Sequence, residues 1–161
     1  MKKPAKDKFA ALRLDNQLCF PLYAASRLVI KLYKPFLDRH GLTYTQYIAM
    51  MALWEKDNVA VNELGERLFL DSGTLTPLLK KLETLGFIRR ERDAADERTV
   101  RIQLTGQGKT LQKTMCDVPR QMAACVHLGR EEAGNLHELL HNLIRNLSST
   151  DGRKNSRPGF F

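Results

Sequence analysis

A mainly α-helical fold with one small β-hairpin is predicted by the apolar pattern of this 161-residue chain. Apolar residues recur at helical spacing over most of the sequence, for example over residues 14–40 and 130–147. Only residues 87–104 change to the pattern of two short strands, around a charged loop at 93–98. A short helix, a turn, a second helix and a hairpin follow in that order, which is typical of a winged helix-turn-helix.

The first long helix is predicted over residues 14–40, with Asp15 as its N-cap and a stop at Gly41. A cap at Asp15 places Cys19 at about the fourth helical position. A thiol there feels the positive end of the helix dipole, which favours the reactive thiolate. A second helix is expected over residues 45–56, with apolar and aromatic side chains on its buried face.

The helix-turn-helix itself is predicted from residues 61–68 and 72–86. Pro77 must lie in or near the first turn of the second helix, because an interior proline costs about 3 kcal/mol. That helix ends at Gly86. Its packed face is a stripe of leucines at helical spacing: Leu75, Leu78, Leu79, Leu82 and Leu85.

After the hairpin, Thr105 can cap a long helix that reaches about Cys125 and that Pro119 bends or interrupts. The last helix follows over residues 130–147. A single domain is therefore predicted over residues 14–147.

Two flanking segments complete the predicted organisation: a basic, flexible N-terminus at 1–13 and a disordered tail at 148–161. The net charge of +8 suggests a polyanionic partner, but residues 59–104 carry eight basic and eight acidic side chains. The total charge therefore does not locate a nucleic-acid surface, and the placement of individual cations must do so.

Composition also excludes several classes of protein. The sequence has no apolar run of membrane-spanning length and no signal peptide, so a cytoplasmic protein without a membrane partner is expected. Its three cysteines lack the spacing of a disulfide framework or a zinc site. His137 and His141 have the i, i+4 spacing of two zinc ligands, but no third ligand is evident. We therefore predict no metal site and no cofactor.

The predicted DNA-binding surface combines the polar face of the second helix with the wing. Small hydroxyl residues at a helix N-terminus suit the major groove, and an arginine at a wing tip suits the minor groove or its phosphates. Asp96 can accept a hydrogen bond from Arg98 or from the turn backbone and so order the tip. The alternative is an ordinary packed helix beside a solvated strand. The candidate residues are Ser72, Thr74, Thr76, Pro77, Lys80, Lys81, Arg90, Arg92, Asp96 and Arg98.

These motifs resemble the MarR family of winged-helix repressors, above all the run Leu70-Asp-Ser-Gly-Thr-Leu-Thr-Pro-Leu-Leu-Lys80 and Asp96-Glu-Arg98. Leu14-Asp-Asn-Gln-Leu-Cys-Phe20 and Leu42-Thr-Tyr-Thr-Gln-Tyr47 are similar to its organic-hydroperoxide-sensing, OhrR-like branch. The resemblance covers residues 14–147. It implies a homodimer held by the N- and C-terminal helices, here 14–40 and 105–147. It also implies repression from a pseudo-palindromic operator on double-stranded DNA until an organic hydroperoxide oxidises the cysteine.

Helical geometry limits which tyrosines can serve Cys19. Tyr23 lies four residues further along the same face, whereas Tyr33 is fourteen residues on, about 21 Å along the axis. Tyr33 therefore cannot touch the cysteine of its own helix. The resemblance implies that Tyr33 and Tyr44 come from the partner subunit to hydrogen-bond the thiolate. The apolar neighbours of Cys19 favour organic or lipid hydroperoxides over hydrogen peroxide.

A sulfenic acid at Cys19 needs a second thiol, supplied by a small molecule or by another cysteine. Because the family's two-cysteine members use a cysteine in the C-terminal half of the partner, the resemblance implies Cys125 as a resolving residue. Cys116 and Cys125 would lie on opposite faces of an uninterrupted helix, so at most one of them faces Cys19, and Cys116 is the less favoured choice. Two other functions stay open: a repressor released by a small phenolic or anionic ligand, with Cys19 incidental, and a cysteine peroxidase. Against the peroxidase, no arginine or threonine lies beside Cys19 in the sequence, so we predict that the protein is not an enzyme.

Overall fold

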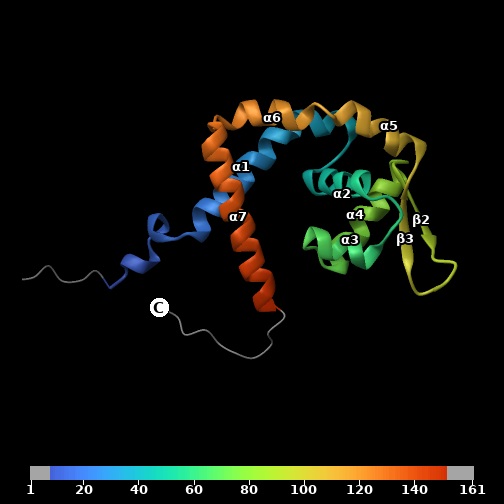
Figure 1. Ribbon diagram of the computed structural model, residues 1–161, viewed down its shortest axis with the longest axis horizontal. Coiled ribbons are helices and arrows are strands. Elements are labelled where there is room, and N and C mark those ends of the chain that lie inside the picture. Colours follow the sequence, from blue (N-terminus) through green and yellow to red (C-terminus); the bar gives the residue numbers. More distant parts are fainter. Residues whose placement is uncertain (1–7, 152–161) are drawn as a thin grey trace, which may run out of the picture. The chain divides into compact units, whose positions relative to one another are not determined.

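The computed structural model describes residues 8–151 of the chain (Figure 1). By its internal contacts the chain divides into two compact units, one ending at Met122 and the other beginning at Ala123, and each is described by itself. The single domain expected over residues 14–147 stays a prediction. The ends of the predicted flanking segments, at 1–7 and 152–161, lie outside the described residues.

The first long helix, α1, covers Cys19–Leu37 and begins later than predicted. Its N-cap is Leu18, which makes no side-chain cap hydrogen bond. Asp15 belongs instead to a separate 3₁₀ helix, Leu14–Asn16. The prediction of Asp15 as the cap is therefore wrong, and Cys19 is the first residue of α1 rather than about its fourth.

Local hydrogen bonding accounts for this late start. Gln17 is extended, with φ −98° and ψ 125°. The side-chain amides of Asn16 and Gln17 donate back to the carbonyls of Ala10 and Ala11, both within a first 3₁₀ helix at Ala10–Leu12. At its other end α1 continues into a 3₁₀ turn, Asp38–His40, and Gly41 ends it with φ +64°, as predicted.

Helices α2 (Tyr44–Glu55), α3 (Val61–Leu68) and α4 (Ser72–Thr84) follow the sequence prediction closely. Thr43 and Gln46 cap α2 reciprocally, with Thr43 N–H donating to Gln46 Oε1 at 2.8 Å. Pro77, however, is the sixth residue of α4, beyond its first turn. Its ring faces solvent, and the carbonyl that loses its partner belongs to the exposed Gly73, which reduces the cost of the missing hydrogen bond.

The predicted hairpin is present as β2 (Ile88–Arg92) and β3 (Val100–Leu104), paired antiparallel with Arg90 opposite Ile102. A third strand, β1 (Val59–Ala60), pairs with the other edge of β3, so that the sheet order is β1-β3-β2. The sequence did not predict β1, because two residues are too few to show alternation.

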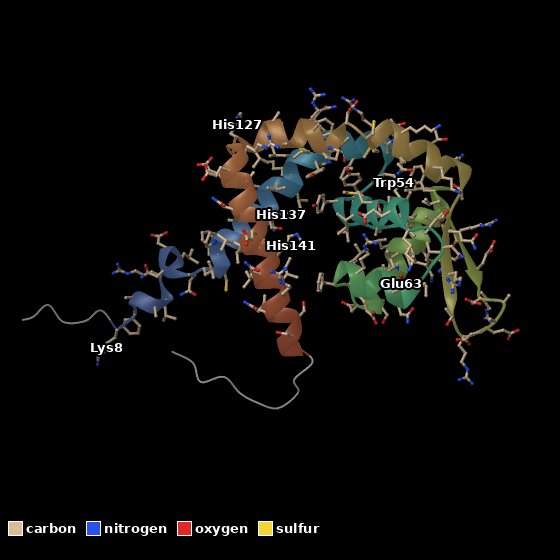
Figure 2. All side chains as sticks on the ribbon, in the orientation of Figure 1. Lys8, Trp54, Glu63, His127, His137 and His141 are labelled. Carbon is tan, nitrogen blue, oxygen red and sulfur yellow. The ribbon has the colours of Figure 1, made fainter. Side chains whose placement is uncertain are left out.

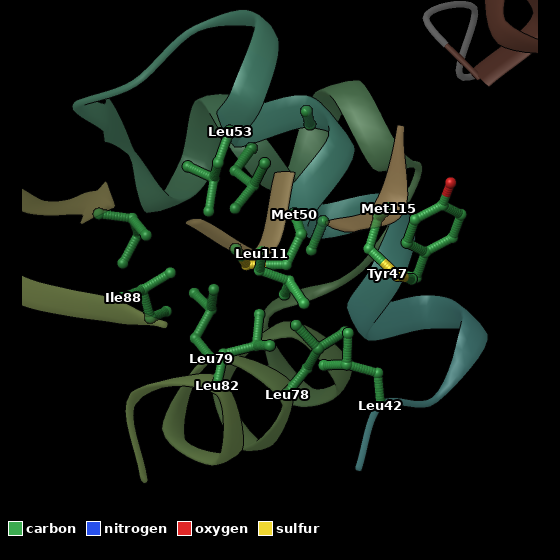
Figure 3. Packing of buried hydrophobic residues seen from close by; sticks show 14 of the residues in the cluster. Leu42, Tyr47, Met50, Leu53, Leu78, Leu79, Leu82, Ile88, Leu111 and Met115 are labelled. Carbon is green, nitrogen blue, oxygen red and sulfur yellow. The ribbon is translucent and has the colours of Figure 1, made fainter. Parts of the chain in front are cut away.

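The core of the first unit is formed mainly by α2, α4, α5 and the sheet, with Leu37 of α1 and Leu64 of α3 (Figure 3). It contains ten of the most deeply buried side chains, including Met50, Leu79 and Ile102. Burying such a side chain contributes about 1.5–3 kcal/mol, so this cluster is the main stabilising element that holds α4 against the sheet. The ten residues are Tyr47, Leu37, Met50, Leu53, Leu64, Leu75, Leu79, Leu82, Ile88 and Ile102.

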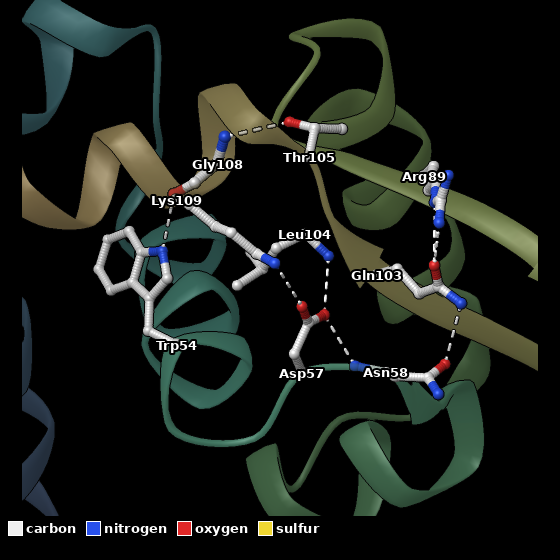
Figure 4. Close-up of polar contacts among 9 residues, drawn as sticks. All are labelled: Trp54, Asp57, Asn58, Arg89, Gln103, Leu104, Thr105, Gly108 and Lys109. Carbon is white, nitrogen blue, oxygen red and sulfur yellow. Dashed lines mark hydrogen bonds and ion pairs between the residues drawn. The ribbon is translucent and has the colours of Figure 1, made fainter.

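Hydrogen bonds attach the base of the wing to α2 and to α5 (Gly106–Met115), as Figure 4 shows. Trp54 Nε1 donates to the Gly108 carbonyl at 2.9 Å. Asp57 Oδ1 accepts from the backbone N–H of Leu104 at 2.8 Å, and so caps the end of β3. Gly108 is required here, because a Cβ at this position would lie 2.1 Å from the Phe87 carbonyl oxygen. The wing therefore starts from a rigid base.

The C-terminal helices are α5, α6 (Val118–Val126) and α7 (Arg130–Asp151). Thr105 caps α5 as predicted, accepting from Gly108 N–H at 3.1 Å, and the helical path is interrupted just before Pro119. Helix α7 runs four residues beyond its predicted end, so the predicted disordered tail is wrong for residues 148–151. No glycine or proline stands there to stop the helix before Gly152. Within residues 8–151, no helix has both the length and the apolar character needed to cross a membrane.

Candidate functional site

The N-terminus of α4 is set by its cap, Asp71. Its Oδ1 accepts from the backbone N–H of Thr74 at 2.8 Å, and its Oδ2 accepts from the Thr74 hydroxyl at 3.1 Å. These hydrogen bonds from Thr74 lower the pKa of Asp71 below its ordinary value. The carboxylate therefore stays charged and fixes the first turn of α4, from which a DNA-reading helix makes its contacts.

The two faces of α4 separate as predicted. Its leucines at 75, 78, 79 and 82 are buried, and all six candidate DNA contacts on this helix are exposed. The Thr74 hydroxyl already donates to Asp71, so toward a ligand it can only accept. The exposed candidates are Ser72, Thr74, Thr76, Pro77, Lys80 and Lys81.

At the wing tip, Asp96 orders the turn rather than the arginine side chain. Its Oδ1 accepts from the backbone N–H of Arg98 at 3.1 Å, and its Oδ2 accepts from the Thr99 hydroxyl at 2.8 Å. Of the two partners predicted for Asp96, the turn backbone is the one observed. The Arg98 guanidinium is exposed and has no hydrogen-bond or ion-pair partner among the residues that the structure describes. It therefore points its full charge toward solvent.

A second carboxylate near the tip, Asp93, also holds the wing by hydrogen bonds. It accepts from Ala95 N–H at 2.8 Å and from the Arg101 guanidinium, and these contacts lower its pKa. Arg101 also donates to the Asn58 carbonyl at 2.9 Å, beside β1. Asp93, Arg101 and Asn58 thus connect the tip of the wing to its base.

Arg90 was predicted as a DNA contact, but the structure places it against α4. Its Nε donates to Glu83 Oε2 at 2.8 Å, and its backbone N–H donates to Glu83 Oε1 at 3.1 Å. Both side chains are only about one-third exposed. Arg92, two residues along β2, is exposed and has no such partner within residues 8–151. Of the two strand arginines, Arg92 is the one free to meet a phosphate.

Cys19 is exposed at the first position of α1, where the backbone N–H groups have no intrahelical acceptor. Tyr23 is also exposed, and its hydroxyl accepts a hydrogen bond from Arg27 Nη1 at 3.1 Å. The Arg27 guanidinium carbon lies 5.6 Å from the Tyr23 ring centroid. Within the described residues, the hydrogen-bond partner of Tyr23 is therefore Arg27 and not Cys19, and its predicted role toward the thiolate stays a prediction.

Tyr33 and Tyr44 meet in one chain, with ring centroids 5.0 Å apart. Tyr47 joins them, with its centroid 5.7 Å from that of Tyr33 and 6.5 Å from that of Tyr44. Burial raises the pKa of all three phenols, that of Tyr47 to about 12 with help from its two neighbours. All three are therefore protonated hydrogen-bond donors at neutral pH. Cys19 and Tyr33 both belong to α1, and the cysteine lies about 21 Å from Tyr33 along the helix axis.

The other two cysteines do not lie on one uninterrupted helix, which the argument about opposite faces required. Cys116 follows the last residue of α5, and Cys125 lies within α6. The argument that placed them on opposite helical faces is therefore wrong, because the helix breaks between them. Both are exposed, free thiols.

Sequence reasoning missed four residues of this region: Arg27, Tyr47, Asn58 and Glu83. Tyr47 was named only as part of the run 42–47 and of the second helix, and Glu83 was given no role. The spacing of Glu83 from Arg90 could have suggested their ion pair only if the turn between α4 and β2 had been known. Within residues 8–151, no group of three or more His, Cys, Asp or Glu side chains is arranged to hold a metal ion.

Comparison with known proteins gives a consistent result. The family described as transcriptional regulator SarA/Rot matches residues 31–115. The chain is 44% identical over 142 residues to the organic hydroperoxide resistance transcriptional regulator of Bacillus subtilis (strain 168), covering 88% of this chain and 97% of that protein.

Solved structures of AbfR from Staphylococcus epidermidis are also similar. Reduced AbfR bound to DNA is 36% identical with a TM-score of 0.72, covering 89% of this chain and 99% of that chain. Disulfide-formed AbfR is 35% identical with a TM-score of 0.59, covering 91% of this chain and 97% of that chain. One of these relatives is therefore known both on DNA and as a disulfide.

Proposed function

Because the chain belongs to the MarR/SarA family of winged-helix, DNA-binding transcriptional regulators, we propose that it is a cytoplasmic, homodimeric repressor that senses organic hydroperoxides through Cys19. Its homologues are regulators and not enzymes. In the reduced state, each protomer inserts α4 into a major groove of a pseudo-palindromic operator, with half-sites about one helical turn apart. The wing tip places Arg98 against the neighbouring minor groove or its phosphates.

The pairing of Tyr33 with Tyr44 is the observation that carries this proposal. Two protonated phenols converge at a point that their own Cys19 cannot reach. In an antiparallel dimer, the α1 helix of the partner brings its cysteine to this pair. The phenols then donate hydrogen bonds to the thiolate, and the exposed N–H groups at the start of α1 add the field of the helix dipole.

The reaction is a two-electron oxidation. The Cys19 thiolate attacks the peroxide, the O–O bond breaks as the S–O bond forms, and one proton is taken up, giving a sulfenic acid and the alcohol. A second thiol then attacks the sulfenic sulfur, forming a disulfide and releasing water. The new sulfur substituent moves the Tyr33 and Tyr44 contacts, and the two DNA modules lose the spacing that the operator requires.

A DNA-binding assay with and without cumene hydroperoxide tests this proposal. The wild-type protein should release its operator after oxidation, whereas Cys19→Ser should stay bound. Equal release by both proteins would overturn the role of Cys19. Oxidation of Cys19 should also be faster with cumene hydroperoxide than with hydrogen peroxide, because the apolar residues around the thiol favour an apolar oxidant.

Cys125 of the partner subunit is the resolving thiol in this proposal. AbfR, which is 35% identical, is known in a disulfide form, which supports a two-cysteine mechanism here. After peroxide treatment, a non-reducing gel should show a covalent dimer that Cys125→Ser removes. Cys116→Ser is the matched control and should leave the dimer intact. Loss of the dimer in Cys116→Ser alone would assign the resolving role to Cys116, and no covalent dimer in any variant would assign it to a small thiol.

A second candidate function is release by a small phenolic or anionic ligand. A cavity of about 690 Å³ beside α1 has Arg27, Lys31 and Lys34 on its lining, next to apolar side chains such as Leu28 and Ile30. Asp38 also lines it and pairs with Lys34, so Arg27 and Lys31 are the cations that an anionic ligand would meet. This combination suits an aromatic carboxylate. DNA release by salicylate from the Cys19→Ser protein would favour this function, and no effect of salicylate would exclude it.

A further inference from the structure

Two histidines of α7, separate from the DNA-binding and cysteine residues described above, direct their ring nitrogens toward each other. His137 and His141 lie one helical turn apart (Figure 2), and their Nε2 atoms are 3.0 Å apart. The ring centroids are 4.3 Å apart, with an interplanar angle of 58°. Both rings are exposed. Two nitrogens at this distance must share one proton or bind one cation between them, because two neutral lone pairs facing each other repel.

The two nitrogens are close enough to chelate one cation. With metal–nitrogen bonds of about 2.0–2.1 Å, a separation of 3.0 Å corresponds to an N–metal–N angle of about 90°. The affinity of nitrogen sites for divalent ions rises through Ni²⁺ to Cu²⁺. Right-angled coordination by nitrogen is typical of square-planar or tetragonal Cu²⁺ and Ni²⁺.

The surroundings leave room for such an ion. Residues one turn before His137 are Ala133 and Gly134, and a Cβ built on Gly134 would meet nothing within 4 Å. The Arg145 guanidinium, one turn after His141, is turned to the Asn142 side-chain oxygen. Because no third protein ligand is arranged here among the described residues, water fills the other coordination positions.

We propose that His137 and His141 form a two-nitrogen chelating site on α7 for Cu²⁺ or Ni²⁺. Binding requires both Nε2 atoms to be unprotonated, so each ring carries its hydrogen on Nδ1 and the shared proton leaves when the metal enters. The ion then joins positions i and i+4 and stabilises this turn of α7.

The test uses Ni²⁺ alone with the untagged full-length protein, since Ni²⁺ does not oxidise thiols as Cu²⁺ does. The three cysteines are first alkylated, so that no thiolate competes for the metal. In proton NMR, substoichiometric Ni²⁺ should broaden the ring resonances of His137 and His141 together. His40 and His127 are the internal controls and should stay sharp. Equal broadening of all four histidines would overturn the proposal without any mutation.

Calorimetry then measures the contribution of chelation. His137→Gln and His141→Gln should each weaken Ni²⁺ binding about a hundredfold, because the second imidazole acts at a high effective concentration once the first is bound. His127→Gln is the matched control and should bind Ni²⁺ like the wild type. A Kd that is unchanged in either His137→Gln or His141→Gln would show that the two rings do not act as a pair.

Discussion

Glu83 and Arg90 join the DNA-reading helix to the wing. The carboxylate of Glu83 in α4 accepts from both the backbone N–H and the guanidinium Nε of Arg90 in β2, at 3.1 and 2.8 Å. Because the pair is half-buried, it is less screened than a surface ion pair. The orientation of β2 relative to α4 is therefore fixed by a bidentate contact as well as by apolar packing.

The first prediction concerns this coupling. Glu83→Gln and Arg90→Ala should each destabilise the protein, and the double variant should lose less than the sum, with a coupling energy of about 1 kcal/mol. Chemical denaturation of the four proteins measures it. The pair Arg89 and Glu91, which lie 3.1 Å apart and are largely exposed, is the control and should show a smaller coupling energy. Additive effects of Glu83→Gln and Arg90→Ala would show that the contact does not hold the two elements together.

The second prediction separates arginines that meet DNA from those that hold the fold. Arg98→Ala should weaken operator binding and reduce the steepness of log K against log salt by about 2, because each subunit of the dimer loses one phosphate contact. Its stability should be unchanged, since the Arg98 guanidinium has no partner within the described residues. Arg92→Ala should behave in the same way.

Arg90→Ala is the matched control for this experiment. This variant should lower stability while leaving the salt slope near that of the wild type. In the wild-type protein the Arg90 guanidinium is paired with Glu83 and does not meet a phosphate. A lowered salt slope with unchanged stability in Arg90→Ala would instead make Arg90 a direct DNA contact, as the sequence analysis assumed.

Periodicity predicted most of the fold, because long amphipathic helices such as α4 and α7 repeat their pattern many times. The errors lie where short-range contacts decide the structure. The start of α1 depends on two side-chain amides, of Asn16 and Gln17, that no apolar pattern reports. Pro77 lies inside α4 because the carbonyl it leaves unpaired is exposed.

In the candidate site, too, some relationships could be predicted from the sequence and others depend on how the helices pack. Helical rise alone showed that Tyr33 cannot serve its own Cys19, since this depends only on sequence separation. Sequence could not show that Tyr47 joins Tyr33 and Tyr44, because that cluster forms only when α2 packs against α1. The sequence also could not show that Arg90 pairs with Glu83, because their contact depends on the turn between α4 and β2.

The third prediction concerns alkaline pH. Tyr47 has a folded pKa of about 12 against an ordinary value of 10.0. Its contribution to stability is therefore fully present below pH 10 and is lost as the pH rises toward 12. Tyr47→Phe should lose less stability than the wild type between these two pH values, as measured by denaturant unfolding. If both proteins lost stability in parallel, Tyr47 would titrate alike in the folded and unfolded states.

The last prediction tests whether the redox site is shared between subunits. In a homodimer of Tyr33→Phe/Tyr44→Phe, each Cys19 lacks its phenol donors, so oxidation by cumene hydroperoxide should slow about tenfold. The decisive protein is a mixed dimer of one such chain with one Cys19→Ser chain. Its single Cys19 is on the chain without the phenols but faces the intact Tyr33 and Tyr44 of its partner, so it should react at the wild-type rate. A mixed dimer as slow as the double-mutant homodimer would place the tyrosines and the cysteine of each site in one chain. Such a result would conflict with their separation of about 21 Å along α1.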